Sequence, residues 1–271
     1  MSYYFYCALL AVPIISAAGY CKDVEIIAHR GASQAAPENT AAAVMLAWEK
    51  KVDGVEIDVH LTKDNRIVVL HDPSTKRTSG VDLEVKNTTA DQLRKLDVGV
   101  FKDAKFAKER IPFLEEIIGT IPPKRKLFVE VKCGTEILPF LKETIAKSGK
   151  AKQIVIIGFD LKTMAASKKL MPDIPTYWLV EATRDEKTNQ WLPHDLKLIQ
   201  TAKDNGLDGV DVDFAGITKE FAAAVKSAGL RLYVWTVDDI EEAKRLKKLE
   251  VSGITTNQPD VIKEKLSALR H

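Results

Sequence analysis

Residues 209–255 read GVDVDFAGITKEFAAAVKSAGLRLYVWTVDDIEEAKRLKKLEVSGIT. Short apolar runs of strand type alternate here with amphipathic patterns of helix type, in the order Gly209–Val212, Thr218–Gly229, Leu232–Trp235, Asp238–Leu249 and Gly253–Thr255. Thr218 is a typical residue to open a helix and Gly229 a typical residue to close one. Strands that alternate with helices predict a parallel sheet, because each helical crossover returns the chain to the same edge.

The same alternation extends back through most of the chain. Five further candidate strands are Val24–Ala28, Gly54–Val59, Leu127–Val131, Ile154–Gly158 and Thr176–Val180. Six further candidate helices are Thr40–Lys51, Phe113–Thr120, Glu136–Ser148, Leu161–Met171, Asp195–Gly206 and Asp260–Ala268. Eight such units in about 250 residues predict a closed (β/α)8 barrel of the TIM type rather than an open doubly wound sheet. No glycine-rich phosphate fingerprint follows the first strand, which argues against a dinucleotide-binding sheet.

One of these units is longer than the others. After the second strand the chain adds a short strand, Ile67–Leu70, and then a loop region of about 73–110 that contains a helix-like segment, Thr89–Leu96. Loops of this length are usually functional lids or binding segments. We therefore expect a small insertion beside the barrel mouth, within a single domain that spans residues 19–271.

The composition limits the possible partners. The 271 residues include 40 Lys and Arg against 38 Asp and Glu, for a formal net charge of +2. These charges are interspersed rather than gathered in a basic stripe, so the sequence predicts no nucleic-acid partner. Three cysteines make no disulfide framework. Cys21 and Cys133 could pair, but free thiols are favoured because a barrel of this size needs no covalent staple.

The N-terminus differs from the rest of the chain. Residues 1–19 hold no acidic or basic side chain, and Tyr6–Ala18 is almost wholly apolar. This pattern predicts a signal peptide, residues 1–18, with cleavage near Ala18. No basic residue precedes the run, which leaves an uncleaved anchor as the alternative, although about 15 apolar residues are short for a membrane span. We therefore predict an exported protein, periplasmic or extracellular, without a stable membrane span in the mature chain.

Acidic side chains occupy alternate positions of the candidate strands. Glu56 and Asp58 lie two residues apart in the second strand, so both carboxylates point to the same face. The next core strand carries Glu130 and then Lys132 in the same alternation. Acids on the inner face of a buried strand are costly unless a cation or base satisfies them. A salt-bridge network would do so, but hard oxygen ligands favour a divalent cation, Ca²⁺ or Mg²⁺.

Two histidines stand where strands end. His29 and Arg30 follow the first strand, and Gly31 allows a sharp turn there. His71 follows the short strand Ile67–Leu70. Strand ends form the mouth of a barrel, where barrel enzymes hold their active sites. Two imidazoles beside a metal form a plausible acid–base pair. Arg30 and Lys132 could offset the charge of a phosphodiester substrate, which phosphoryl transfer requires.

Taken in order along the chain, these motifs resemble those of the glycerophosphodiester phosphodiesterase family. The matching segments are His29-Arg30-Gly31, Pro37-Glu38-Asn39-Thr40, Glu56-Ile57-Asp58-Val59, Leu61-Thr62-Lys63-Asp64, His71-Asp72, Arg110-Ile111-Pro112, Leu114-Glu115-Glu116, Glu130-Val131-Lys132, Trp235-Thr236-Val237-Asp238 and the tail Gly253–Asp260. The resemblance covers nearly everything after the leader.

The resemblance implies a TIM-type barrel with a small insertion after the second strand. It implies that a divalent cation is held by Glu56, Asp58 and Glu130 and that His29 and His71 are the general acid and base. Arg30 and Lys132 would hold the phosphate. Trp235, at the end of the seventh core strand, either packs beside the glycerol moiety or is a core tryptophan without a role in the site. In this family the glycerol hydroxyl of the substrate is thought to attack phosphorus and give a cyclic phosphate that water opens. The products would be glycerol 3-phosphate and an alcohol such as choline or ethanolamine.

Several other polar residues carry weaker predictions. Asn39 or Thr40 would cap the first helix, and Asp211 and Asp213 would extend the polar site or pair with lysines. His60 and His194 lie off the strand-end pattern and are interpreted as surface or structural residues. Asn257 stands where the family more often has an aspartate, in a region that we expect to be structural.

Two alternatives to glycerophosphodiester hydrolysis remain. One is a phosphodiesterase directed at lysophospholipids or phosphoinositides, which would need an apolar ramp at the mouth, and residues 73–110 are too polar to predict one. The other is a barrel that binds a phosphoester without turnover, which would need no acid–base pair. The sequence leaves the head group, the native metal and the oligomeric state open.

Overall fold

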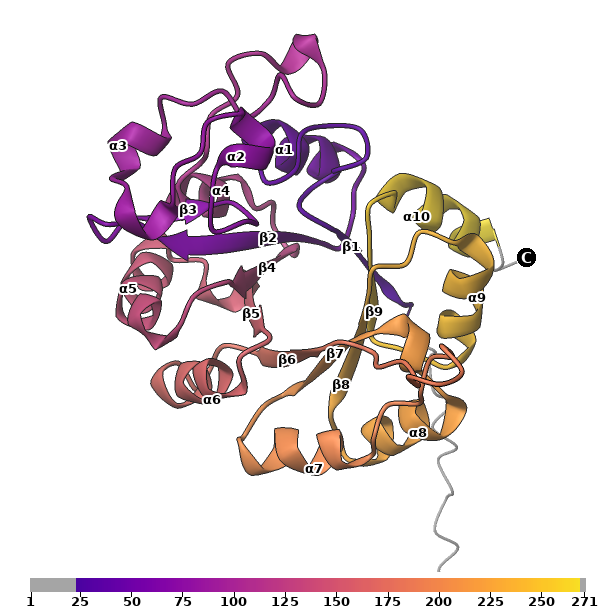
Figure 1. The fold of residues 1–271 in the computed structure, drawn as a ribbon. Coiled ribbons are helices and arrows are strands. Elements are labelled where there is room, and N and C mark those ends of the chain that lie inside the picture. Colours follow the sequence, from indigo (N-terminus) through magenta and orange to yellow (C-terminus); the bar gives the residue numbers. More distant parts are fainter. Residues whose placement is uncertain (1–22, 269–271) are drawn as a thin grey trace, which may run out of the picture.

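The parallel strands close into a barrel in the computed structural model, which describes residues 23–268 (Figure 1). The strands are β1 (Glu25–Ala28), β2 (Gly54–Leu61), β3 (Ile67–Val69), β4 (Lys126–Val131), β5 (Ile154–Gly158), β6 (Thr176–Val180), β7 (Gly209–Asp213), β8 (Arg231–Trp235) and β9 (Gly253–Thr256). They pair in the order β1-β9-β8-β7-β6-β5-β4-β2-β3, and an additional β1–β2 pairing closes the ring. Because β3 alone is antiparallel to its neighbour, the barrel itself has eight parallel strands. The prediction of a (β/α)8 barrel is confirmed.

Helices surround the barrel on its outer side (Figure 1). They are α1 (Ala41–Glu49), α2 (Lys76–Ser79), α3 (Ala90–Leu93), α4 (Leu114–Thr120), α5 (Leu138–Ser148), α6 (Leu161–Leu170), α7 (Lys197–Asp204), α8 (Lys219–Ser227), α9 (Ile240–Lys248) and α10 (Pro259–Ser267). The predicted ends of the eight barrel strands and of the helices between them agree with these bounds to within two residues. The extra strand expected at Ile67–Leu70 is β3.

Two apolar layers hold the barrel together. The larger layer lies between the strands and the helices and contains the outward residues of β2, Val55, Ile57 and Val59, all of them buried. The smaller layer fills the barrel interior, where the rings of Tyr177 and Tyr233 stack at 5.0 Å. Alternation along each strand explains this arrangement, since successive side chains point to opposite faces. The middle of the interior is therefore packed with apolar side chains, and the active-site end of such a barrel is the one that holds the carboxyl ends of the strands.

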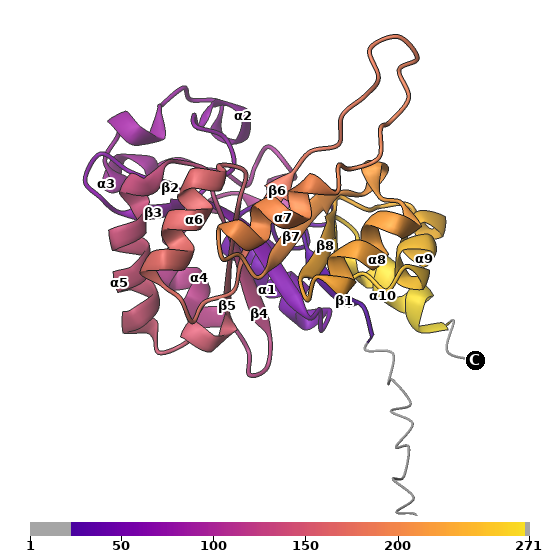
Figure 2. The same ribbon diagram turned by 90° about the horizontal axis from the view of Figure 1, so that it is seen from below.

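Residues 73–110 form a small unit beside the barrel. This segment holds α2, α3 and two short 3₁₀ turns, Val85–Asn87 and Ala104–Phe106. It shares a small core with β3 and the residues that flank the segment, and the buried apolar residues of this core are Val68, Leu70, Val85, Leu93, Val98 and Ile111. In Figure 2 it stands at one side of the barrel, and the long connection between β6 and α7, residues 181–196, projects near the other.

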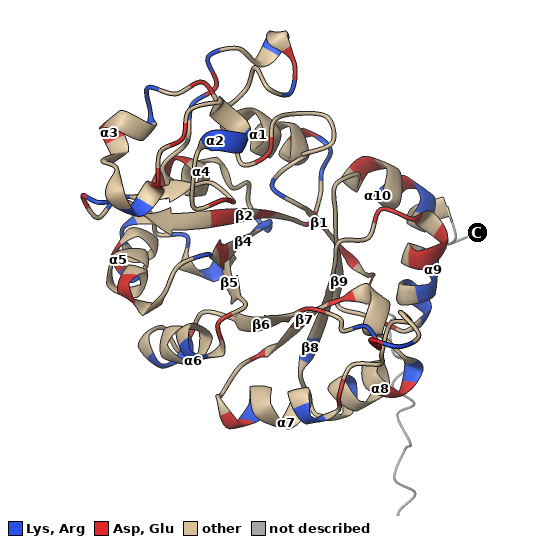
Figure 3. Cartoon of the chain, in the orientation of Figure 1, with Lys and Arg blue, Asp and Glu red and all other residues tan. Residues whose placement is uncertain are grey.

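The charged residues are distributed around the outer helices, where Lys and Arg alternate with Asp and Glu (Figure 3). Acidic positions also occur inside the ring, on β2. Over residues 23–268, no helix combines the length and the apolar character that a membrane crossing requires. The predicted signal peptide, residues 1–18, lies outside the described residues, and so does Cys21.

Candidate active site

A cavity of about 390 Å³ opens at the end of the barrel where the parallel strands finish. It is lined by seven of the eight residues that the sequence predicts for the site: His29, Arg30, Glu56, His71, Glu130, Lys132 and Trp235. The eighth, Asp58, lies beneath the cavity wall and is almost fully buried. Segments as far apart in the chain as His29 and Trp235 therefore meet at one place, because neighbouring barrel strands end side by side.

Three carboxylates converge inside the barrel. Glu56, Asp58 and Glu130 each offer an oxygen atom, and these three atoms lie within 4.8 Å of one another. Asp58 and Glu130 face each other directly in the register of β2 and β4. The alternation that sends Val55, Ile57 and Val59 outward sends the acids inward. All three carboxylates are buried.

This cluster has the properties of a cation site. Glu56 Oε1 and Asp58 Oδ1 are buried and have no hydrogen-bond partner. Burial, followed by the charges of Asp58 and Glu130, raises the pKa of Glu56 well above its ordinary value. Burial and then the charge of Asp58 raise the pKa of Glu130 to about 7. Three buried acids, two of which have an unpaired carboxylate oxygen, are suitable ligands for a hard divalent cation.

Two positive side chains border the carboxylates. Lys132 Nζ lies 2.6 Å from Glu130 Oε1 and 3.7 Å from Asp58 Oδ1. Arg30 Nε lies 3.4 Å from Asp58 Oδ2, and the Arg30 backbone N–H donates to Glu56 Oε2 at 2.8 Å. Both cations also line the cavity, so they can face an anion bound there.

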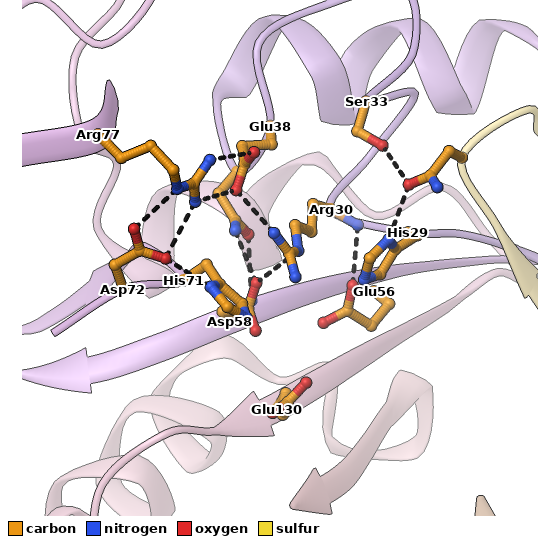
Figure 4. Close-up of polar contacts among 12 residues, drawn as sticks. His29, Arg30, Ser33, Glu38, Glu56, Asp58, His71, Asp72, Arg77 and Glu130 are labelled. Carbon is orange, nitrogen blue, oxygen red and sulfur yellow. Dashed lines mark hydrogen bonds and ion pairs between the residues drawn. The ribbon is translucent and has the colours of Figure 1, made fainter. Parts of the chain in front are cut away.

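The two histidines reach the cavity from different strand ends, and each is held at Nδ1. Asn257 Oδ1 lies 2.8 Å from Nδ1 of His29. Asp72 Oδ1 lies 2.6 Å from Nδ1 of His71 (Figure 4). Burial, then the charge of Arg30, lowers the pKa of His29 below its usual range. Lys132 Nζ lies 3.3 Å from Nε2 of His71. Because each ring is held at Nδ1 and lines the cavity, Nε2 is the ring nitrogen left to act there.

A network of alternating charges links the insertion to this site (Figure 4). Arg77, from α2, donates to both oxygens of Asp72 and to both oxygens of Glu38. Arg30 donates to the same Glu38 at 2.9 Å. Burial alone would raise the pKa of Glu38, but Arg77 and Arg30 outweigh it and hold this pKa at about 2. The insertion therefore fixes Asp72, which in turn holds His71.

We expect Arg77→Lys to lower kcat about 10-fold, within the range for loss of a residue that orients a functional group. An ammonium cannot form the paired hydrogen bonds that a guanidinium makes to two carboxylates, so Asp72 would hold His71 less firmly. Lys76→Arg is the matched control, because Lys76 precedes Arg77 on α2 and its side chain pairs with Asp82 instead. Steady-state kinetics check this expectation, and unchanged kcat in Arg77→Lys would contradict it.

The turn after β1 depends on Gly31. Its φ is +80°, and a Cβ at this position would lie 2.6 Å from the backbone carbon of Ala43. We expect Gly31→Ala to lower the free energy of unfolding by about 2–4 kcal/mol, through backbone strain and a clash in α1. Gly80→Ala is the control, because Gly80 has a similar φ of +75° but open space around it. It should cost about 1 kcal/mol. Equal losses of unfolding free energy in the two variants, measured by urea unfolding, would show that the contact between position 31 and Ala43 is unimportant.

The acidic cluster should make the stability of the chain depend on pH when divalent cations are removed. The folded-state pKa of Glu130, about 7, is above the ordinary value of 4.5, so the folded state binds the proton more tightly. Stability from this group is present at low pH and is lost as the pH rises to about 7, by about 3 kcal/mol. Urea unfolding in EDTA between pH 5 and 8 measures this loss. Glu130→Gln should make the free energy of unfolding depend less on pH, and an unchanged pH dependence would contradict the raised pKa of Glu130.

Part of the cavity lining is apolar. Trp235 belongs to this part and contacts Phe159 edge to face at 5.5 Å between ring centroids. The indole N–H of Trp235 donates to the backbone oxygen of Asp211 at 3.2 Å. Asp211 also lines the cavity and is buried, and burial raises its pKa well above the ordinary value. Asp213 is not among the residues that line the cavity, and its side chain accepts from the backbone N–H of Ala215.

The structure decides between the two roles predicted for His60 and His194. Both are structural rather than surface residues, since they are buried and hydrogen-bond to the backbone oxygens of His71 and Asp213 respectively. Asn257 is not merely structural, because it contacts His29. No local pattern could have indicated this contact, since 228 residues separate the two positions.

The pair Asn39-Thr40 divides two tasks between its residues. Thr40 caps α1 by accepting from the backbone N–H of Ala43. Asn39 has a φ of 58° and donates to Asp58 Oδ2 at 2.7 Å, while its own Oδ1 accepts from the Asp58 backbone N–H. Asn39 therefore fixes a carboxylate of the cluster. A motif of Pro, Glu and Asn just after a strand-end histidine is the signal that could have indicated this role.

Comparison with known proteins is consistent with this geometry. A family model described as "Glycerophosphoryl diester phosphodiesterase family" matches residues 29–261. A glycerophosphodiester phosphodiesterase of Caldanaerobacter subterraneus subsp. tengcongensis is 34% identical over 242 residues, covering 88% of this chain and 95% of that protein. The structure of an Oleispira antarctica phosphodiesterase in complex with the product sn-glycerol-3-phosphate is similar, with a TM-score of 0.81 and 25% identity. The match covers 90% of this chain and 97% of that one. A glycerophosphodiester phosphodiesterase of Thermotoga maritima shares the fold, with a TM-score of 0.71, 24% identity, and coverage of 89% and 97%.

Proposed function

Because this chain belongs to the glycerophosphoryl diester phosphodiesterase family, we propose that it hydrolyses glycerophosphodiesters to sn-glycerol 3-phosphate and an alcohol. The observation that carries this proposal is the convergence of two histidines and three buried carboxylates at one cavity. A barrel that only binds a phosphoester would need neither a pair of acid–base groups nor the desolvation of three acids.

The three carboxylates fit a divalent cation, and we propose Ca²⁺ or Mg²⁺ as that ion. Glu56, Asp58 and Glu130 would hold it, since each offers an oxygen within 4.8 Å of the other two. In addition, Glu56 and Asp58 each have one buried oxygen without a hydrogen-bond partner. A divalent cation in this position supplies positive charge that offsets the negative charge of a phosphodiester in the transition state. Asn39 keeps Asp58 in place for this task.

Arg30 and Lys132 would orient the phosphate. Both side chains line the cavity and stand beside the carboxylate cluster, so a phosphate that approaches the cluster meets positive charge on two sides. Positioned charges of this kind stabilise the anionic transition state without reorganisation. Trp235 and Phe159 form an apolar wall that suits the carbon atoms of a glycerol moiety.

The histidines would move the protons. We propose that the glycerol 2-hydroxyl of the substrate attacks phosphorus and expels the alcohol, which gives a cyclic phosphate. One imidazole takes the hydroxyl proton and the other gives a proton to the leaving oxygen. Water then opens the ring as the roles reverse, so the overall reaction consumes one water and returns both histidines to their initial states.

Release of glycerol 3-phosphate from glycerophosphocholine tests the proposal. The purified chain is treated with EDTA and assayed with added Ca²⁺, Mg²⁺ or Mn²⁺, alongside glycerophosphoethanolamine, glycerophosphoinositol and lysophosphatidylcholine. We expect cation-dependent release of glycerol 3-phosphate from the deacylated substrates. Turnover of lysophosphatidylcholine alone would favour a lipid-directed enzyme, and binding without turnover would favour a non-catalytic barrel.

A further inference from the structure

A chain of side-chain hydrogen bonds runs behind His29, on the side away from the carboxylates. Asp238 Oδ2 accepts from Asn257 Nδ2 at 2.6 Å, and Asn257 Oδ1 lies 2.8 Å from His29 Nδ1. The three residues follow β8, β9 and β1, which are neighbours in the barrel. Asp238 is itself fixed by two further donors, the Thr256 hydroxyl and the backbone N–H of Asn257, both at 2.8 Å.

The hydrogen-bonding capacity of each group allows one arrangement. An ionised carboxylate only accepts, so the amide nitrogen of Asn257, and not its oxygen, must face Asp238. The amide oxygen then faces His29, and this oxygen also accepts from the Ser33 hydroxyl at 3.0 Å. Because an amide oxygen cannot donate, Nδ1 of His29 must carry the proton. The neutral ring therefore has its lone pair on Nε2.

We propose that Asp238, acting through Asn257, sets the tautomer of His29, so that Nδ1 carries the proton and Nε2 is ready to accept one at the cavity. Asp238 and Asn257 are positioning residues in this proposal, and neither touches the substrate. The consequence for the reaction rests on the proposed function, whereas the tautomer itself is a property of the chain.

The partner of His29 differs from the partner of His71 in charge. Asn257 is neutral, so it fixes the ring without favouring a second proton, and burial together with Arg30 lowers the pKa of His29. Asp72 is a carboxylate, which can balance the charge of a doubly protonated ring. The two histidines are therefore prepared differently, and His29 is the one held ready to take the proton of the attacking hydroxyl.

The substitution Asp238→Asn should reverse the tautomer. The new amide at position 238 would keep an oxygen for Thr256 and the backbone N–H of residue 257, and it would present an NH₂ group where Asp238 Oδ2 was. Asn257 would then rotate its amide to place the oxygen on that NH₂ group. Its own NH₂ would face His29, whose Nδ1 must then accept and whose Nε2 must carry the proton. Nε2 of His29 would change from a proton acceptor to a hydrogen-bond donor, with no change in the backbone.

The double substitution Asp238→Asn with Asn257→Asp should restore the original tautomer. The amide introduced at position 238 would donate to one oxygen of the new carboxylate, and the other oxygen would accept from His29 Nδ1. Every hydrogen bond of the native chain is then present again, with donor and acceptor exchanged between positions 238 and 257. Asp239→Asn is the matched control, because Asp239 is the neighbouring acid and its side chain caps α9 instead of contacting Asn257.

Long-range ¹⁵N–¹H spectra of the full chain labelled with ¹⁵N-histidine report the tautomer directly. The sequence has five histidines, and the His29 signals are identified by their loss in His29→Gln. We expect Nδ1–H in the native chain, Nε2–H in Asp238→Asn, and Nδ1–H in the double variant and in Asp239→Asn. The kcat for glycerophosphocholine should fall about 10- to 100-fold in Asp238→Asn, with KM changed less than about threefold. It should recover in the double variant when the assay pH is high enough to remove the second proton that the new carboxylate at position 257 favours on His29.

Native His29 protonated at Nε2 would overturn the inference, and so would an unchanged tautomer in Asp238→Asn. Loss of activity in Asp238→Asn that the double variant does not recover would overturn the link to turnover. Circular dichroism and urea unfolding show whether each variant is folded. If the tautomer reverses and recovers as expected but the native chain hydrolyses no glycerophosphodiester, the inference stands and the proposed function fails.

Discussion

Replacing either His29 or His71 by alanine is expected to lower kcat by about two to four orders of magnitude and leave the fold intact. Each ring lines the cavity, and the side chain of His71 is 30% exposed, so its removal leaves little void in the apolar core. The variant that carries both His29→Ala and His71→Ala should have a kcat only slightly below that of the slower single variant, because groups that act in one proton-transfer sequence do not contribute additively. Steady-state kinetics with glycerophosphocholine measure all three.

The control for this expectation is His194→Gln. His194 is a buried histidine outside the cavity, and its Nε2 lies 2.7 Å from the backbone oxygen of Asp213, a hydrogen bond that glutamine can also donate. It should retain kcat to within about threefold, since it takes no part in proton transfer. Near-normal turnover in His29→Ala or His71→Ala would refute the acid–base assignment. A comparable loss in His194→Gln would show that the assay responds to stability instead.

Glu56→Gln is expected to weaken binding of Ca²⁺ or Mg²⁺ at least about 100-fold, the upper end of what even an outer-shell partner contributes. The substitution removes one of three clustered carboxylates, including an oxygen that has no partner in the protein. It should also stabilise the chain in EDTA, because it removes a charge that burial and two neighbouring acids disfavour. Weaker binding combined with higher stability without the cation distinguishes a lost ligand from general damage.

Isothermal calorimetry of the EDTA-treated chain measures the affinity, and urea unfolding measures the stability. Glu181→Gln is the matched control, since Glu181 is exposed, lines the same cavity and lies outside the cluster. It should leave affinity within about threefold, because long-range charge in water is screened. Unchanged affinity in Glu56→Gln would show that the three acids do not form the cation site.

Most of the fold follows from local patterns along the chain. The outward residues of β2 and the acids between them obey a period of two, which is visible in the amino-acid sequence alone. Eight alternations of strand and helix then imply closure, and closure brings the ends of β1, β2 and β4 together. For this reason the carboxylates of Glu56 and Glu130 could be placed in one site from sequence.

The residues that support the site could not be found in this way. Arg77 lies in the insertion, whose path no periodic pattern describes, yet it bridges Glu38 and Asp72. Asn257 follows the last strand and meets His29 only because β9 closes the barrel against β1. These contacts depend on the conformations of loops, and loop conformation is set by packing between distant segments.

Strand direction and alternation are local properties of the backbone, so the amino acids alone indicate which side chains project into the barrel and at which end. The atoms that those side chains bind, the protonation of His29 and the raised pKa values of Glu56 and Glu130 instead depend on contacts between distant segments. Hydrogen bonds act over about 3 Å and burial depends on every surrounding segment. Neither quantity exists until loops separated by hundreds of residues have been brought together.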